Sequence, residues 1–137
     1  MSEKLKDLMT RVTTLDDVKL GGLGLSFEII DGQVAKVTAE DRNELPIYVT
    51  LADDQLLCIC NLFDEDQVIA EKRSELFESM LSLNVPMPLS AFAKMDEKFA
   101  IFGAMSLNSS DEDVALEITT LSDNSLDAIE ALSDYLK

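Results

Sequence analysis

The stretch LSFEIIDGQVAKVTA, residues 25–39, decides how this chain folds. Its first half places apolar side chains at every second position, which is the period of a half-buried β-strand. Asp31 and Gly32 follow, and this pair favours the tight turn of a β-hairpin because both residues tolerate positive φ. The stretch therefore predicts two antiparallel strands, the second over residues 34–39.

The same kind of periodicity extends the prediction over the rest of the chain. Alternating apolar residues indicate five further strands, over residues 47–51, 56–62, 91–95, 99–106 and 114–119. Helical spacing of apolar residues indicates helices near residues 5–12, from Asp64 to about residue 83, and over about residues 123–136. Asp64 and Gln67 have the spacing of a capping box at the start of the central helix. The order α-β-β-β-β-α-β-β-β-α predicts a single α+β domain over residues 1–137, with a mostly antiparallel sheet.

The composition excludes several classes of partner. The 137 residues include 27 Asp and Glu but 11 Lys and Arg, which gives a net charge of −16, and 47% are hydrophobic. A chain this acidic repels the phosphates of nucleic acids and anionic lipids, so we expect no nucleic-acid partner. We find no signal peptide and no apolar stretch of about 20 residues, and therefore expect a cytoplasmic protein without direct membrane insertion.

No residue pattern marks a catalytic or metal site. The sequence has no histidine, which removes His-based triads and His ligands to a metal. Cys58 and Cys60 are interpreted as small buried hydrophobes in a reducing compartment. The acidic residues 108–113 lack the central glycine of a calcium loop, and the glycine stretch at residues 21–24 lacks the lysine of a phosphate-binding loop. We expect no enzyme, no cofactor and no metal; a small enzyme that uses a carboxylate pair or a divalent metal stays open as the alternative.

Two of the predicted strands are apolar on both faces. The runs LLCIC, residues 56–60, and FAIFGA, residues 99–104, lack the polar alternation expected when helices cover one face of a sheet. Either the strands lie between two layers of helices, or another chain covers the second face; we favour the latter, as a homodimer or a partner groove. The expected contacts with a partner or a second copy are Leu57, Ile59, Phe99, Ile101 and Met105.

The last third of the chain is strongly acidic. No Lys or Arg occurs between Lys98 and Lys137, whereas eight Asp and Glu do. Such a field attracts basic segments of a partner, although high net charge also serves solubility alone.

The order of these elements resembles a known fold. An amphipathic helix opens the chain, strands and a central helix follow, and a second amphipathic helix ends it; the residues that carry the likeness are Leu25, Phe27, Asp31, Gly32, Leu126, Ala128, Leu132 and Leu136. This layout is similar to the class I type III secretion chaperones, typified by the Tir chaperone. The resemblance implies a small acidic cytosolic homodimer that holds an extended protein segment over apolar patches, with contacts on residues 56–60 and 99–105.

The stretch SLDAIEAL, residues 125–132, and the overall layout also resemble the YjfI-like proteins, a family of small bacterial cytoplasmic proteins. This resemblance implies membership of a family without an assigned activity, whose genes tend to lie near a gene for a membrane-stress protein of the phage-shock type. It transfers no functional residue. We therefore expect a non-enzymatic chaperone-like or adaptor protein that engages a basic or apolar segment of a protein partner, with a link to membrane stress.

Overall fold

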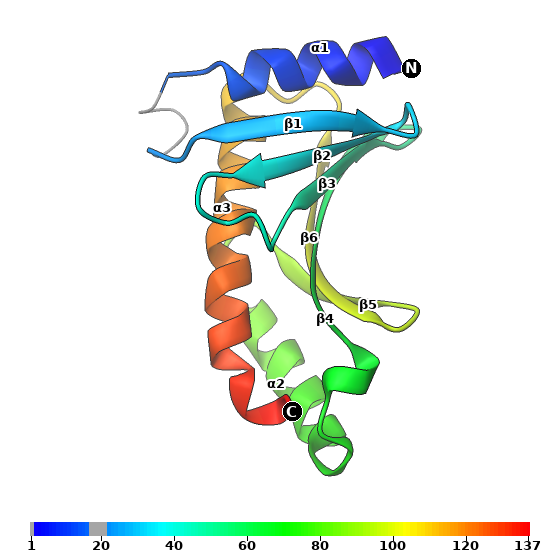
Figure 1. Ribbon diagram of the computed structural model, residues 1–137, viewed down its shortest axis with the longest axis vertical. Coiled ribbons are helices and arrows are strands. Elements are labelled where there is room, and N and C mark those ends of the chain that lie inside the picture. Colours follow the sequence, from blue (N-terminus) through cyan, green and yellow to red (C-terminus); the bar gives the residue numbers. More distant parts are fainter. Residues whose placement is uncertain (1, 17–21) are drawn as a thin grey trace.

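The computed structural model describes residues 2–16 and 22–137, and its α-helices lie on one side of an antiparallel sheet (Figure 1). The helices are α1 (Ser2–Thr13), α2 (Arg73–Asn84) and α3 (Asp111–Ala131), with short 3-10 turns η1 (Glu65–Gln67), η2 (Ala70–Lys72) and η3 (Ser133–Tyr135). The strands are β1 (Leu25–Ile30), β2 (Val34–Ala39), β3 (Ile47–Leu51), β4 (Gln55–Asp64), β5 (Ala91–Met95) and β6 (Lys98–Ser106). They pair in the order β1-β2-β3-β4-β6-β5, each pair antiparallel, which confirms the predicted α+β class. No helix in the described ranges is long and apolar enough to span a bilayer.

One row of apolar side chains crosses all six strands on the side that the helices cover. In strand order the row is Phe27, Val37, Ile47, Cys60, Ile101 and Phe92. Residues paired across neighbouring strands point to the same face, so the register brings these side chains together. Residues along β2 and β3 accordingly alternate between buried and half-buried.

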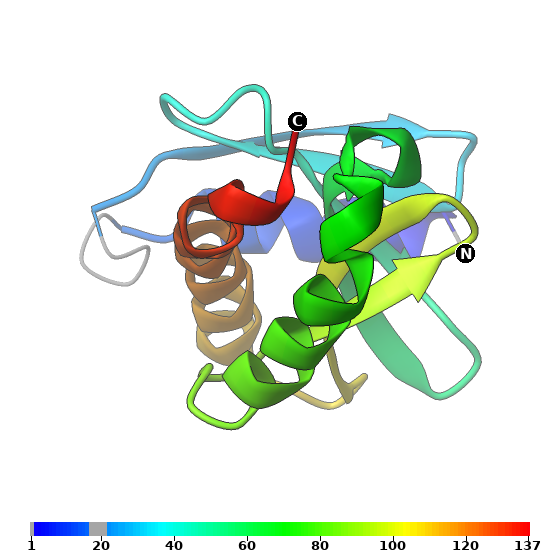
Figure 2. The same cartoon turned by 90° about the horizontal axis from the view of Figure 1, so that it is seen from below.

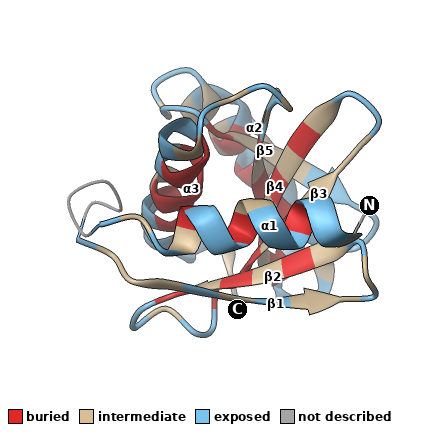
Figure 3. Cartoon of the chain, turned by 90° about the horizontal axis from the view of Figure 1, so that it is seen from above, coloured by how far each residue is buried: buried red, intermediate tan, exposed pale blue. Residues whose placement is uncertain are grey.

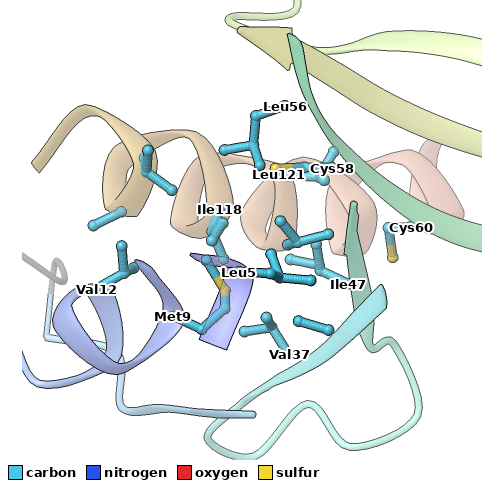
Figure 4. Packing of buried hydrophobic residues seen from close by; sticks show 14 of the residues in the cluster. Leu5, Met9, Val12, Val37, Ile47, Leu56, Cys58, Cys60, Ile118 and Leu121 are labelled. Atoms are coloured by element: carbon cyan, nitrogen blue, oxygen red, sulfur yellow. The ribbon is translucent and has the colours of Figure 1, made fainter. Parts of the chain in front are cut away.

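The larger core cluster lies between this row and two helices. Leu5 and Met9 on α1 and Ile118 and Leu121 on α3 point toward the sheet and are fully buried (Figure 4). Both helices are buried toward the sheet and exposed outward (Figure 3). A continuous apolar interior therefore joins α1, α3 and the inner face of the sheet.

A second core cluster lies at the other end of the sheet, where α2 packs. The ring of Phe99 lies 5.2 Å from that of Phe63 and 5.9 Å from that of Phe77 on α2, measured between centroids. Val68, Leu76, Met80 and Leu132 also belong to the cluster, so α2 and the segment after α3 close the same end of the core.

The strand predicted over residues 114–119 is wrong, because this segment is the first half of α3. The Oγ of Ser110 accepts the Asp113 N–H at 3.1 Å and caps the helix, and acidic residues occupy its first turn. Val114 and Ile118 lie on the buried side of this helix. The sheet therefore has six strands rather than seven, and the helix predicted from about residue 123 begins at Asp111 instead.

The start of the central helix also differs from the prediction. The Asp64 N–H does donate to Gln67 Oε1 at 2.8 Å, as a capping box requires, but it caps η1, and α2 begins at Arg73. The intervening Val68 is held extended because it forms a β-bridge with Leu136. Of the glycine stretch at residues 21–24, Gly21 lies outside the described residues.

A buried carboxyl group lies at the contact between α3 and β6. Glu117 is 6% exposed, and its Oε2 has no hydrogen-bond partner among the described residues. A Cβ built on Gly103 of β6 would stand 1.9 Å from this oxygen, so glycine is what leaves room for the carboxyl group. Burial raises the pKa of Glu117 above its ordinary value of 4.5.

The cap of α3 gives a first test. We expect Ser110→Ala to lower the free energy of unfolding by about 1 kcal/mol, because the Asp113 N–H loses its acceptor. Urea unfolding followed by circular dichroism measures the loss. Ser82→Ala is the matched control, since Ser82 is exposed on α2. Equal losses in the two variants would contradict the capping role.

The buried Glu117 should also make stability depend on pH. Its pKa is higher in the folded than in the unfolded chain, so its stabilising contribution is complete below the ordinary pKa and is lost as the pH rises through the folded pKa. We expect Glu117→Gln, which cannot ionise, to raise the free energy of unfolding by about 1 kcal/mol near pH 8, with a smaller gain toward pH 5. Denaturant unfolding across this pH range checks the trend, with Glu130→Gln on the exposed side of α3 as control. The idea fails if Glu117→Gln keeps the pH dependence of the unchanged protein.

A candidate partner-binding face

The side of the sheet opposite the helices carries a second row of side chains. Across β2, β3, β4, β6 and β5 it runs Lys36, Tyr48, Ile59, Phe102 and Ala91, and the pair Leu57 and Ala104 lies beside it. Within the described chain, none of these side chains belongs to either core cluster. We call the apolar set the open sheet face: Tyr48, Leu57, Ile59, Ala91, Phe102 and Ala104.

The strand register, rather than a local motif, assembles the open sheet face. Ile59 stands between Tyr48 and Phe102 as their directly paired neighbour, and all three are half-buried. Cross-strand pairs of aromatic and β-branched residues contribute roughly 0.2–1 kcal/mol each. Mutual contact thus shields part of these side chains, and the apolar surface that remains is available to a second chain.

The structure separates the five predicted contact residues. Leu57 and Ile59 lie on the open sheet face. Phe99 and Ile101 are fully buried and face the helices, so they belong to the core of this chain. Met105 is half-buried and packs against the larger core cluster. Successive residues of a strand point to opposite faces, so an apolar strand places only half of its side chains on each face of the sheet.

Four members of the open sheet face were absent from the five expected contact residues: Tyr48, Ala91, Phe102 and Ala104. Phe102 follows Ile101 directly, so the period of two places these two residues on opposite faces of the strand. Tyr48 can be assigned to this face only from its pairing with Ile59, which depends on the register between β3 and β4.

A second apolar surface lies between α2 and the edge strand β5, which Figure 2 shows side by side. The groove has a volume of about 310 Å³, and its lining includes Phe77, Met80, Leu81 and Phe92. Asn84 Oδ1 accepts the Phe92 N–H at 2.7 Å on the outer edge of β5. This contact occupies part of the strand edge that another strand would use.

The acidic charge of α3 is partly neutralised within the chain. Arg11 approaches Asp111 at 3.1 Å, and Arg42 approaches Asp123 at 2.7 Å. Exposed ion pairs of this kind contribute about 0–1 kcal/mol each, so they orient α3 more than they stabilise it. Glu130 remains exposed on the outer side of the helix.

The two cysteine thiols are enclosed in the core rather than presented in a cleft. Burial raises the pKa of the Cys58 thiol to about 12 and also raises the pKa of Cys60, so neither forms the thiolate that acts as a nucleophile. In the part of the chain that the structure describes, no group of three or more His, Cys, Asp or Glu could hold a metal ion. Burial of apolar surface is the chemistry that this arrangement supports best.

Solved structures with a similar fold include chains from two protein–protein complexes, one of them the complex of a type III secretion chaperone. A chain of the complex between the Yersinia pestis type III secretion chaperone SycH and a fragment of YscM2 has a TM-score of 0.55 and 16% identity, covering 89% of this chain and 97% of that one. A chain of the ExsC–ExsE complex has a TM-score of 0.54 and 14% identity, covering 91% and 90%. YbjN from Escherichia coli has a TM-score of 0.67 and 16% identity, covering 99% and 94%. At such low identity the similarity shows the fold alone.

Sequence relatives identify the family. YjfI of Escherichia coli strain K12 is 47% identical over 127 residues, covering 82% of this chain and 93% of YjfI, and YjfI of strain O157:H7 gives the same values. The family model described as "Uncharacterized protein conserved in bacteria (DUF2170)" matches residues 5–136. The chain therefore belongs to this bacterial family, DUF2170, as its resemblance to the YjfI-like proteins predicts.

Proposed function

We propose that this protein is a non-enzymatic adaptor or chaperone-like protein that binds another polypeptide through the open sheet face. The observation that carries the proposal is the row of Tyr48, Ile59 and Phe102, which is continuous over three strands and lies opposite the described helices. Burial of apolar area contributes about 25 cal/mol per Å², before the costs of ordering the two chains.

The expected partner presents an apolar segment flanked by basic residues. A net charge of −16 raises the encounter rate with such a segment, and the apolar face then supplies affinity. Two of the proteins with a similar fold, SycH and a chain of the ExsC–ExsE complex, come from structures that contain a protein partner, which supports this class of function. A role in a membrane-stress response, implied by the family resemblance, is part of the proposal.

The proposal includes a homodimer in the cytoplasm. The surface that supports a second copy is the end of α2 beside the groove, where Leu81 is 71% exposed and Val85 is 90% exposed one helical turn later. A contact at this end leaves the open sheet face for the partner. Buried, reduced Cys58 and Cys60 suit the reducing cytoplasm.

The partner-binding role is tested by comparing two variants: one places a negative charge on the open sheet face, and the control places the same charge beside that face. We expect the tagged protein to retain a polypeptide in stoichiometric amount from lysate of its native host. Ile59→Asp should reduce that retention at least about tenfold, because removing a carboxylate from water in the contact costs free energy. Thr38→Asp adds the same charge on the same side of the sheet, outside the apolar row, and should retain the partner. Quantitative mass spectrometry measures retention, and circular dichroism checks folding.

Equal retention by Ile59→Asp and Thr38→Asp would exclude the open sheet face as the surface that binds the partner. Failure of the unchanged protein to retain any polypeptide would remove the adaptor function itself.

The homodimer is tested by light scattering. We expect a mass of about 30 kDa for the unchanged protein, twice the 15.1 kDa of one chain, and a mass near 15.1 kDa for Val85→Glu. Thr38→Asp should remain dimeric. A mass of 15.1 kDa for the unchanged protein at about 0.1 mM would contradict the dimer without affecting the partner-binding test.

A further inference from the structure

The segment that joins α2 to β5, residues 85–90, crosses the inner side of the sheet as a strap. Asn124 on α3 donates from Nδ2 to the Pro88 carbonyl at 2.8 Å and to Ser90 Oγ at 3.0 Å. Leu89 between them has φ of +62°, a left-handed conformation that a leucine rarely adopts. The strap is therefore clamped in a strained conformation that surrounding contacts must maintain.

The carboxyl group of Glu117 lies under the strap. Both Glu117 Oε2 and the Leu89 carbonyl oxygen crowd one point above Gly103: a Cβ built there would lie 1.9 Å from the first and 3.1 Å from the second. An ionised carboxylate and a carbonyl both only accept hydrogen bonds, so they repel each other at close range. A protonated carboxyl group has an O–H that can donate to the carbonyl.

We propose that Glu117 is a proton-operated latch on the strap. In its neutral form the Glu117 O–H donates to the Leu89 carbonyl and holds residues 85–90 closed. When Glu117 ionises, the carboxylate repels that carbonyl, the strained Leu89 relaxes, and the strap lifts from α3 and β6. Burial keeps the proton on Glu117 above its ordinary titration range, so the change is sought from about pH 5 upward.

Other ionisable groups near the latch do not replace Glu117. Cys58 on β4 faces it, but a pKa of about 12 keeps that thiol neutral over this range. The strap and the β6 residues 99–106 contain no ionisable side chain. On α3 itself Asp113 is exposed one turn earlier, and Asp127 is exposed where it lines the cavity between the strap and α3. Glu117 is the one of these carboxyl groups that is enclosed.

Opening of the strap would change an apolar cavity. A cavity of about 200 Å³ lies between the strap and α3, lined in part by Pro86, Met87, Phe92 and Ala128. Lifting the strap widens this cavity and moves Val85, one of the most exposed apolar side chains described. Protonation of a single buried group would thereby control the apolar surface at this end of the molecule.

The test is a ¹⁵N and ¹³C NMR titration of the full chain from about pH 5 to pH 9. The Gly103 amide and the Glu117 carboxyl carbon report ionisation of Glu117, and the Leu89 and Ser90 amides report the strap. Exchange of the Asn124 side-chain amide with water reports loss of its bonds to Pro88 and Ser90. The exposed side chain of Asn43 corrects this exchange for its intrinsic pH dependence.

We expect all of these signals to change with one midpoint, and the corrected Asn124 exchange to rise at least about fivefold as the pH rises. Glu117→Gln should hold the strap closed throughout, with strap signals that do not titrate, and Glu130→Gln should behave as the unchanged protein. The proposal is overturned if Glu117 ionises while Leu89, Ser90 and Asn124 stay constant, or if no signal titrates over this range. It is also overturned if the strap titrates in Glu117→Gln. The coincidence of midpoints in the unchanged protein decides the question even if Glu117→Gln fails to fold.

Discussion

The packing of α3 across the inner face of the sheet is the contact on which the other features depend. This 21-residue helix supplies Ile118 and Leu121 to the larger core cluster, and the residue directly after it, Leu132, belongs to the smaller one. Several polar residues of α3 are buried, and among them Glu117 has a carboxyl oxygen without a hydrogen-bond partner among the described residues; Gly103 opposite it has no side chain and leaves room for this group. The helix thereby joins both ends of the core and fixes the position of the strap through Asn124.

Because the described helices lie on one side of the sheet, they do not cover the apolar side chains on the other side. An antiparallel sheet can expose one face to water, but the side chains on that face are normally polar. Here Lys36 and Thr38 follow that rule on β2, whereas Ile59 and Phe102 on β4 and β6 do not. On β2 Val34 is also apolar on this face, whereas Lys36 and Thr38 form a polar border beside the row, as expected of a contact surface.

The elements predictable from sequence were those whose signals are local. The bounds of β2 and β3 agree with prediction because alternation and the Asp31-Gly32 turn act over a few residues. Val114 and Ile118 satisfy both a strand and a helical period, and the intervening Leu116, 52% exposed, shows that the strand pattern was accidental. The extended backbone at residues 68–69 depends on pairing with the end of the chain, which no local signal encodes. The faces of Phe99, Ile101 and Phe102 likewise depended on knowing which strand face the helices cover.

The contact between α1 and α3 joins segments about a hundred residues apart, as the pair of Arg11 and Asp111 shows. Contacts this distant in sequence slow folding, because a long loop must close before they form. During synthesis at about 5–20 residues per second, the six strands leave the ribosome before α3 does. For several seconds the nascent sheet can therefore expose apolar side chains on both faces. The interval before α3 emerges is then the time at which this chain is most exposed to aggregation and to the cell's general folding machinery.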